Sequence, residues 1–407
     1  MVKRKELKNR LVLVTEKKNT KYVMLLIGIN VGSIHESNEL NGASHFNEHM
    51  VFKTNKHRSY KQLLEDFERL GAKVNAYTAY DRTVFWAKSL PESLNEIIDI
   101  YYEGITNFEY VESEFRKEKE VVLTEARMYM DDPKSFIDDL FISSLYKSTP
   151  LEKPIIGKLK TLKKMKKGDL EKFKKENYVA SNTVIGVVGK FDEKSLEKKI
   201  LETFGKIRKG KKNKIPPIKI ENKKRLIEKR IDAAQAYLYL GYRVPTYDSE
   251  DWCKIFFLKE ILYGGMSSRL FQSLREEKGI GYSVGCNYID LAENSGCFYV
   301  YIDGFDAKRK DEAIDTILKE FKKLKENFVS DDELERRKKV ALFKFYENVS
   351  KIEYIAEEIV DRELTNRKLN LFKKDKFIKK INKKHIIEAA NKYLNDDFTL
   401  VIGYPKN

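Results

Sequence analysis

The chain has few cysteines and histidines and no long hydrophobic run. Its three cysteines are Cys253, Cys286 and Cys297, and neither their spacing nor their odd number is typical of a metal site or a disulfide framework. No apolar run reaches the roughly 18 residues needed to span a membrane, and no apolar segment with a cleavage site follows the basic N-terminus. These absences predict a cytoplasmic protein that does not bind a membrane.

Acidic residues are outnumbered, since 79 lysines and arginines face 63 aspartates and glutamates and the formal net charge is +16. Binding to nucleic acid would require a basic face with stacking aromatic residues, or a known binding module. The sequence contains neither, and most lysines alternate with glutamates along predicted helices. We therefore expect solvated helix faces and no nucleic-acid partner.

The length of 407 residues exceeds what one ordinary core accommodates. The polar stretch 206–224 contains two consecutive prolines and indicates a linker. Beyond it, the order of predicted strands and helices repeats that of the first half, and the closing segments 178–189 and 393–403 resemble each other. We predict an α+β fold of two similarly folded domains, residues 1–205 and 225–407, joined by this linker. Each domain should be a mostly antiparallel sheet packed with helices on one face.

Apolar runs and turn residues predict the elements of the first domain. Ser59, followed three residues later by Gln62, indicates a capping box at the start of a helix that ends at Gly71. The segments 10–15 and 22–31 should form a hairpin. Further strands are predicted at 73–79, 83–88 and 183–189, and further helices at 112–130 and 193–203.

Four of the five histidines lie between His35 and His57. His45 and His49 are four residues apart with Glu48 between them, so on a helix all three side chains share one face. This His-x-x-Glu-His order is the inverzincin form of the commoner His-Glu-x-x-His motif. Two imidazoles can hold a divalent metal while a neighbouring carboxylate acts as a base. The alternative is a pair of helical histidines without a metal.

A catalytic metal needs a third protein ligand, and no suitable histidine remains. The predicted helix 112–130 offers Glu118 and Glu125, which are seven residues apart and project close to the apolar stripe of Phe115 and Val122. Glutamates on an inward face are costly unless a cation neutralises them. The alternative for this lysine-rich helix is that both glutamates lie at the surface.

The segment containing His45, Glu48 and His49, followed by Glu118 and Glu125, resembles the M16 (pitrilysin-type) zinc metallopeptidases. The resemblance is to their small two-domain form, similar to the beta subunit of mitochondrial processing peptidase. It implies that the two histidines and Glu125 are metal ligands and that Glu48 is the general base. It also implies that Glu118 supports the site from behind the ligands.

Two further segments carry the resemblance. The segment 75–78 resembles the family's edge strand on the substrate side of the metal, which implies four substrate-binding residues: Asn75, Ala76, Tyr77 and Thr78. Arg275 and Tyr282 resemble a pair in the second domain that reaches the bound peptide. The resemblance implies that Tyr282 donates a hydrogen bond to the reacting carbonyl and that Arg275 holds the chain. Asn47 departs from the pattern, because many relatives have an apolar residue there.

Together these matches imply an endopeptidase that cleaves unfolded or short peptides with one Zn²⁺ per chain, although such a ligand set would also accept Mn or Co. The resemblance further implies a homodimer whose subunits enclose a chamber. The alternative is a non-catalytic M16-like subunit, or the partner chain of a heterodimeric peptidase. Such chains usually lack part of the ligand set, whereas here the three ligands and the base are all present.

Overall fold

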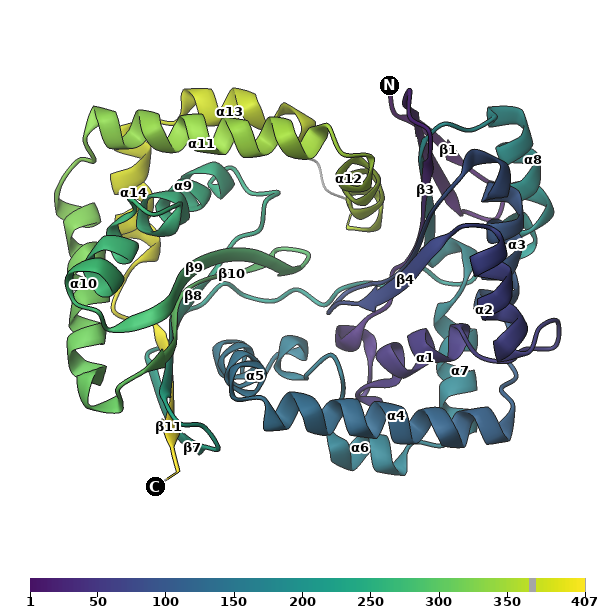
Figure 1. Ribbon diagram of the computed structural model, residues 1–407, viewed down its shortest axis with the longest axis horizontal. Helices are drawn as coiled ribbons and strands as arrows, with labels where there is room; N and C mark the ends of the chain where they lie inside the picture. Colours follow the sequence, from purple (N-terminus) through teal and green to yellow (C-terminus); the bar gives the residue numbers. More distant parts are fainter. Residues whose placement is uncertain (366–370, 407) are drawn as a thin grey trace. The chain divides into compact units, whose positions relative to one another are not determined.

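A computed structural model describes residues 1–365 and 371–406. The chain divides into two compact units (Figure 1). The first unit comprises Met1–Arg127, Lys153–Ile215 and Asn348–Lys368, and the second comprises Met128–Glu152, Pro216–Glu347 and Leu369–Asn407. Each unit contains one mixed, mostly antiparallel sheet packed with helices, which confirms the predicted α+β class. Among the described residues, no helix is long and apolar enough to cross a membrane.

The sheet of the first unit has six strands in the order β1-β2-β6-β3-β5-β4. Their bounds are β1 (Lys3–Glu6), β2 (Val12–Lys17), β3 (Val23–Ile29), β4 (Lys73–Thr78), β5 (Thr83–Ser89) and β6 (Thr183–Gly189). Neighbours are antiparallel except β2 and β6. The predicted hairpin of β2 and β3 is wrong, because β6 lies between them. Every residue of β6 is buried, so this strand needs a neighbour on both edges.

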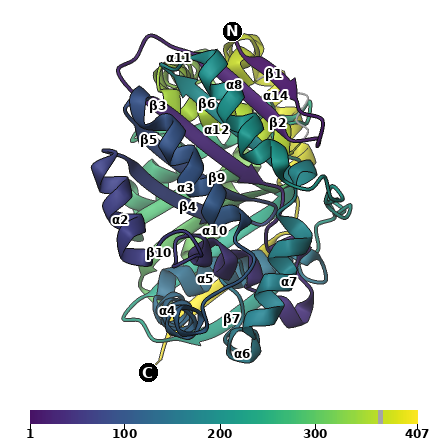
Figure 2. The ribbon, with the colours of Figure 1, turned by 90° about the vertical axis from the view of Figure 1, so that its right-hand side faces the viewer.

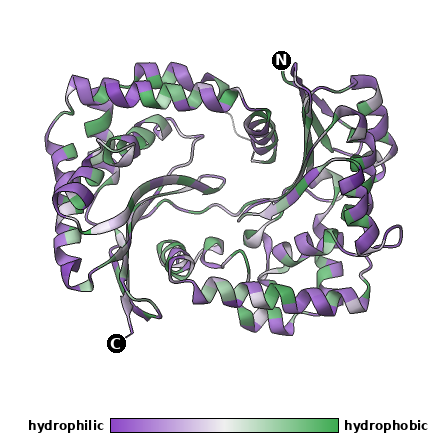
Figure 3. Ribbon diagram, viewed as in Figure 1, coloured by the Kyte–Doolittle hydropathy of each residue, from purple (hydrophilic) through white to green (hydrophobic). Residues whose placement is uncertain are grey.

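Helices of the first unit pack on one face of this sheet and enclose its core. They are α1 (Ala43–Val51), α2 (Tyr60–Arg69), α3 (Leu94–Thr106), α4 (Glu112–Asp131), α6 (Leu159–Lys164), α7 (Lys167–Asn177) and α8 (Glu193–Glu202). Hydrophilic and hydrophobic residues alternate along them (Figure 3), as expected for helices with one buried face. The predicted capping box of α2 is confirmed, since Ser59 Oγ accepts from the Gln62 amide and Gln62 Oε1 accepts from the Ser59 amide.

The other face of the first sheet is covered by α12 (Ile352–Leu364), a helix from the second half of the chain. Figure 1 shows α12 and α3 on opposite sides of this sheet, and Figure 2 shows the strands β3, β5 and β4 in the turned view. Glycines let the helix approach: a Cβ on Gly186 would lie 2.3 Å from Val360 Cγ2, and one on Gly28 would lie 2.6 Å from Leu364 Cδ1. Helices therefore cover both faces, not one as predicted.

The second unit repeats this plan. Its strands are β7 (Arg225–Ile231), β8 (Ala236–Val244), β9 (Gly281–Ala292), β10 (Ser295–Phe305) and β11 (Thr399–Pro405), in the order β7-β11-β8-β10-β9. This order reproduces β2-β6-β3-β5-β4 of the first sheet, including one parallel pair at the same place. The repeat expected from the sequence is therefore present in the topology.

The helices of the second unit include one from the first half of the chain. They are α5 (Pro133–Leu145), α9 (Trp252–Tyr263), α10 (Lys310–Glu326), α11 (Asp331–Val349), α13 (Lys374–Lys380) and α14 (Lys383–Tyr393), with a π-helix at Phe271–Glu277. Helix α5 packs on β8 and β11, where Gly241 and Gly403 leave room for it. Each unit thus takes the equivalent helix from the other half of the sequence. The predicted linker contains neither helix nor strand from residue 207 to residue 224.

Candidate metal centre

Helix α1 carries both histidines of the motif, as predicted. Phe46 and Met50 are buried in the core of the first unit. His45 and His49 lie one turn apart, and their ring centroids are 4.7 Å from each other. Asn47, which departs from the pattern that the sequence resembles, is fully buried and accepts a 2.6 Å hydrogen bond from a tyrosine hydroxyl. The core therefore anchors one side of the helix and leaves the imidazoles on another.

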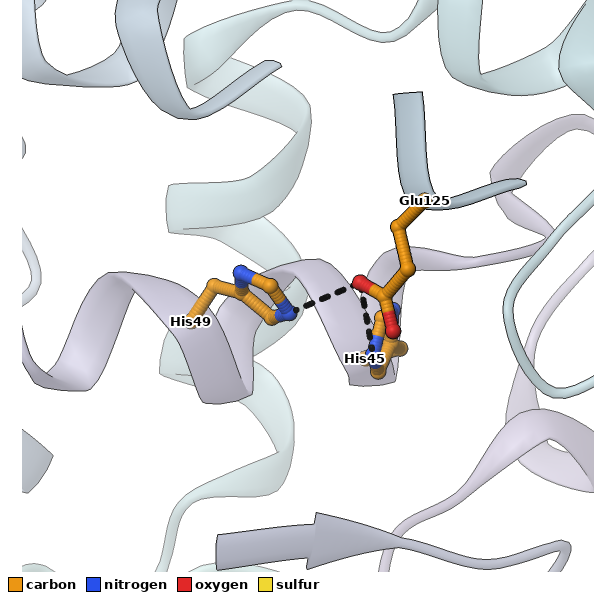
Figure 4. Close-up of side chains that lie close together, drawn as sticks. All are labelled: His45, His49 and Glu125. Carbon is orange, nitrogen blue, oxygen red and sulfur yellow. Dashed lines mark ion pairs between the residues drawn. The ribbon is translucent and has the colours of Figure 1, made fainter. Parts of the chain in front are cut away.

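Glu125 of α4 comes to the two imidazoles. Its Oε2 lies 3.8 Å from His45 Nε2 and 3.4 Å from His49 Nε2 (Figure 4). One potential ligand atom of each residue lies within 4.8 Å of the others, and this is the single such group among residues 1–365 and 371–406. Ligands at 2.0–2.1 Å from a tetrahedral zinc ion are about 3.3 Å apart. Two imidazoles and one carboxylate are also a known zinc set, so these residues fit the metal.

Glu118 and Lys53 lie behind His49. His49 Nδ1 is 2.7 Å from Glu118 Oε1, and Lys53 Nζ is 2.6 Å from Glu118 Oε2. A carboxylate at Nδ1 fixes the orientation of a ligating imidazole and leaves Nε2 for the metal. Glu118 thus lies where the sequence placed it. The sequence analysis assigned no role to Lys53. Its position four residues after His49 could have indicated that the two side chains are neighbours.

The carboxylates give the two histidines different affinities for protons. Burial alone lowers the pKa of His49, but the hydrogen bonds that its protonated ring donates to the carboxylates of Glu118 and Glu125 outweigh burial and raise that pKa to about 9. Burial, together with the neighbouring His49, lowers the pKa of His45 to about 4. The hydrogen bond with His49 lowers the pKa of Glu125, so this carboxyl is ionised at neutral pH. A metal ion at this point would displace a proton from His49, because a ligating imidazole is neutral, and the ionised Glu125 would offset part of the charge of the metal.

Glu48 lies on α1 between the two histidines in sequence, and it is 9% exposed. Its Oε2 accepts a 2.5 Å hydrogen bond from Thr78 Oγ1. Burial raises the pKa of Glu48, while the hydrogen bond from Thr78 opposes that increase. The contact holds one orientation of the carboxylate, and sequence reasoning did not foresee it.

Strand β4 contributes Thr78 and the rest of the predicted substrate segment. It is one of the two edge strands of the first sheet and pairs with β5 from Lys73 to Thr78. Burial raises the pKa of Tyr77 to about 12, and Asn75 Oδ1 accepts from the amide of Ala76. Thr78, the last residue of β4, is the residue that contacts Glu48.

The remaining predicted site residues belong to the second unit. Arg275 lies in the π-helix and Tyr282 at the start of β9. The Arg275 guanidinium carbon is 4.4 Å from the centroid of the Tyr282 ring, and Tyr282 is 81% exposed. The two side chains that the sequence paired are thus neighbours within their own unit.

Comparisons with known proteins agree with this architecture. The chain matches the model of Insulinase (Peptidase family M16) over residues 11–159 and that of the Peptidase M16 inactive domain over residues 164–340. It is 34% identical over 363 residues to an uncharacterized zinc protease of Rickettsia felis, covering 87% of this chain and 85% of that relative. The chain belongs to the M16 peptidase family. The predicted resemblance is therefore confirmed.

Other M16 proteins are similar along most of the chain. The uncharacterized zinc protease YmxG of Bacillus subtilis is 33% identical over 340 residues, which is 83% of this chain and 82% of that one. The crystal structure of a protease from Helicobacter pylori is 22% identical with a TM-score of 0.92 and covers 100% of both chains. At that level of identity, the structural likeness shows the fold alone. The M16 match covers both units, of which only the first contains a metal-ligand group among the described residues.

Proposed function

We propose that this M16 chain is a zinc-dependent endopeptidase that cleaves unfolded or short peptides, with Glu48 as its general base. The observation that carries the proposal is the convergence of His45, His49 and Glu125 at one point, with Glu48 on the same helix as both histidines. Relatives named as zinc proteases support the choice of metal.

The residues of the chain divide the chemistry between them. Zinc bound to His45, His49 and Glu125 would polarise the scissile carbonyl and lower the pKa of a water molecule. Glu48 accepts the proton of the attacking water and then delivers it to the leaving amine. Burial, which raises its pKa, suits a group that both takes up and gives up a proton. Thr78 keeps the carboxylate in the orientation that this transfer needs.

Strand β4 is the proposed binding site for the peptide backbone. An extended peptide can add to an exposed sheet edge as a further strand, and its affinity then comes mainly from main-chain hydrogen bonds. The last residue of β4, Thr78, contacts Glu48. A peptide bound along residues 75–78 would therefore extend toward the base. Such binding accepts many side chains but requires an extended substrate. We therefore propose unfolded or short peptides rather than folded proteins.

Arg275 and Tyr282 are proposed to contact the same peptide from the second unit. The exposed Tyr282 hydroxyl can donate a hydrogen bond to the developing oxyanion, and Arg275 can hold a backbone carbonyl. Their roles rest on the family resemblance, as does the proposed homodimer that encloses a chamber. The proposed domains 1–205 and 225–407 divide the chain by sequence position. In the fold, α5 of the first half belongs to the second unit and α12 of the second half belongs to the first unit.

The test combines metal analysis with hydrolysis of an unstructured fluorogenic peptide. We expect one zinc per chain, loss of activity with a chelator, and recovery when zinc is restored. Glu48→Gln should keep the zinc and lower kcat/KM by about 10²- to 10⁴-fold, whereas Glu120→Gln, at an exposed position of α4, should change neither. Stoichiometric zinc without cleavage by the wild-type chain would favour the non-catalytic subunit. A native mass measurement tests the homodimer.

A further inference from the structure

The helix that carries the histidines lacks the usual side-chain cap. Its N-cap residue is Gly42, whose φ of 100° lies in the left-handed region. A Cβ on Gly42 would lie 2.8 Å from Leu162 Cδ2 and 3.0 Å from Gly157 Cα. Packing thus requires glycine where serine, threonine or aspartate normally accepts from the first amides of a helix. These amides need another acceptor, because they have no partner within the helix.

Glu36 provides that acceptor from outside the helix. Its Oε2 accepts from the amide of Gly42 at 2.8 Å, and its Oε1 accepts from the amide of Ser44 at 2.8 Å. Glu36 is 4% exposed, so few water molecules compete for these bonds. A carboxylate at a helix N-terminus also interacts favourably with the helix dipole. Glu36 therefore replaces the side chain of an N-cap residue, although it lies six residues before Gly42 in the sequence.

The surrounding loop holds Glu36 in this place. Asn41 Nδ2 donates to Glu36 Oε2 at 3.0 Å and to the carbonyl of Pro154 at 3.0 Å, while Asn41 Oδ1 accepts from the amide of Lys158. The ammonium of Lys153 donates to the carbonyl of Glu36. Burial raises the pKa of Glu36, and its hydrogen bonds with the two helix amides and with Asn41 offset only part of that increase. The carboxylate thus joins the start of the helix to residues 153–158.

We propose that Glu36 is a positioning residue for the metal centre, because it holds the first turn of α1 and thereby His45 in place. His45 directly follows Ser44, whose amide Glu36 binds. Without the carboxylate this turn has fewer hydrogen bonds, and the His45 imidazole is less ordered before the metal binds. Ordering it on binding costs free energy, so the affinity for the metal falls. The inference rests on the proposed metal centre at His45, His49 and Glu125.

The test compares Glu36→Gln with Asp192→Asn in the full-length chain. Both replacements are isosteric and remove a carboxylate that caps a helix, since Asp192 Oδ1 accepts from the Ser195 amide at the start of α8. Each protein is stripped of metal, and its zinc affinity is measured by competition with a chromophoric chelator at a temperature where circular dichroism shows it folded. The visible absorption spectrum of the Co²⁺-loaded protein reports the geometry of the ligands.

We expect Glu36→Gln to weaken zinc affinity about tenfold, at the lower end of the 10- to 100-fold loss for partners of metal ligands, and to change the cobalt spectrum. Asp192→Asn should leave both metal readouts unchanged. Zinc affinity of Glu36→Gln within twofold of wild type, with an unchanged cobalt spectrum, would overturn the positioning role and leave the proposed function intact. A wild-type chain that binds no zinc would overturn the proposed function and this inference with it.

Discussion

Lys174 of α7 is a fully buried lysine, and we expect its titration to make the stability of the first unit depend on pH. Its ammonium donates 2.8 Å hydrogen bonds to the carbonyls of Gly104 and Asn107, at the C-terminal end of α3. These carbonyls have no partner within their helix, and a cation suits that end of the helix dipole. Tyr110, whose ring lies 5.2 Å from the ammonium, donates its hydroxyl hydrogen to Asn47 of α1.

Burial lowers the pKa of Lys174 from 10.5 to about 7. Between these two values the unfolded chain binds more protons than the folded chain, so the free energy of unfolding rises with pH. The contribution is fully present above pH 10.5 and is lost as the pH falls through about 7. The full difference corresponds to about 4–5 kcal/mol, and raising the pH from 7 to 9 should recover about 2 kcal/mol of it.

Lys174→Met removes this titration and keeps most of the volume of the side chain. Urea unfolding of wild type and variant is measured at pH 7, 8 and 9. The free energy of unfolding of wild type minus that of the variant should increase by about 2 kcal/mol from pH 7 to pH 9. Lys175→Met, at an exposed neighbour on the same helix, should show no such trend. A wild-type-minus-variant difference that stays constant between pH 7 and pH 9 would refute the reasoning.

Two further predictions concern the packing of α12 and the support of the metal ligand. Gly186→Ala places a methyl group 2.3 Å from Val360 Cγ2 and should lower the free energy of unfolding by about 1–3 kcal/mol. Adding Val360→Ala should restore part of that loss in a double-mutant cycle by urea unfolding, and strictly additive effects would contradict the packing. Glu118→Gln replaces the carboxylate at His49 Nδ1 with a neutral amide and should weaken zinc affinity about 10- to 100-fold. Unchanged affinity in chelator competition would show that the charge of Glu118 does not support the ligand.

The candidate metal centre could be predicted because its residues lie on two helices with regular spacing. His45 and His49 are one turn apart, and Glu118 and Glu125 are two turns apart, so helical periodicity alone places each pair on one face. The scarcity of histidine made the first pair conspicuous, and the family resemblance joined the two helices. The contact of Glu48 with Thr78 was not predictable, since it joins a helix to a strand edge that no local pattern brings together.

The capping role of Glu36 illustrates the same limit. Sequence patterns for a helix cap concern the residue just before the helix, and here that residue is Gly42, which has no side chain. Glu36 reaches the helix only because the loop between them folds back and Asn41 holds it there. Its spacing from the motif carries no periodic signal.

Local pattern by itself predicted most of the strands and helices, the repeat of two similar halves and the capping box at Ser59. It also placed His45 with His49, and Glu118 with Glu125, on shared helix faces. The tertiary structure alone decided that β6 lies between β2 and β3 and that α5 and α12 each belong to the unit of the other half. The physical reason is that periodicity reports which face of an element is apolar but not which distant element covers it. That choice depends on the close approach of α12 at Gly28 and Gly186, between residues more than 150 positions apart in the chain.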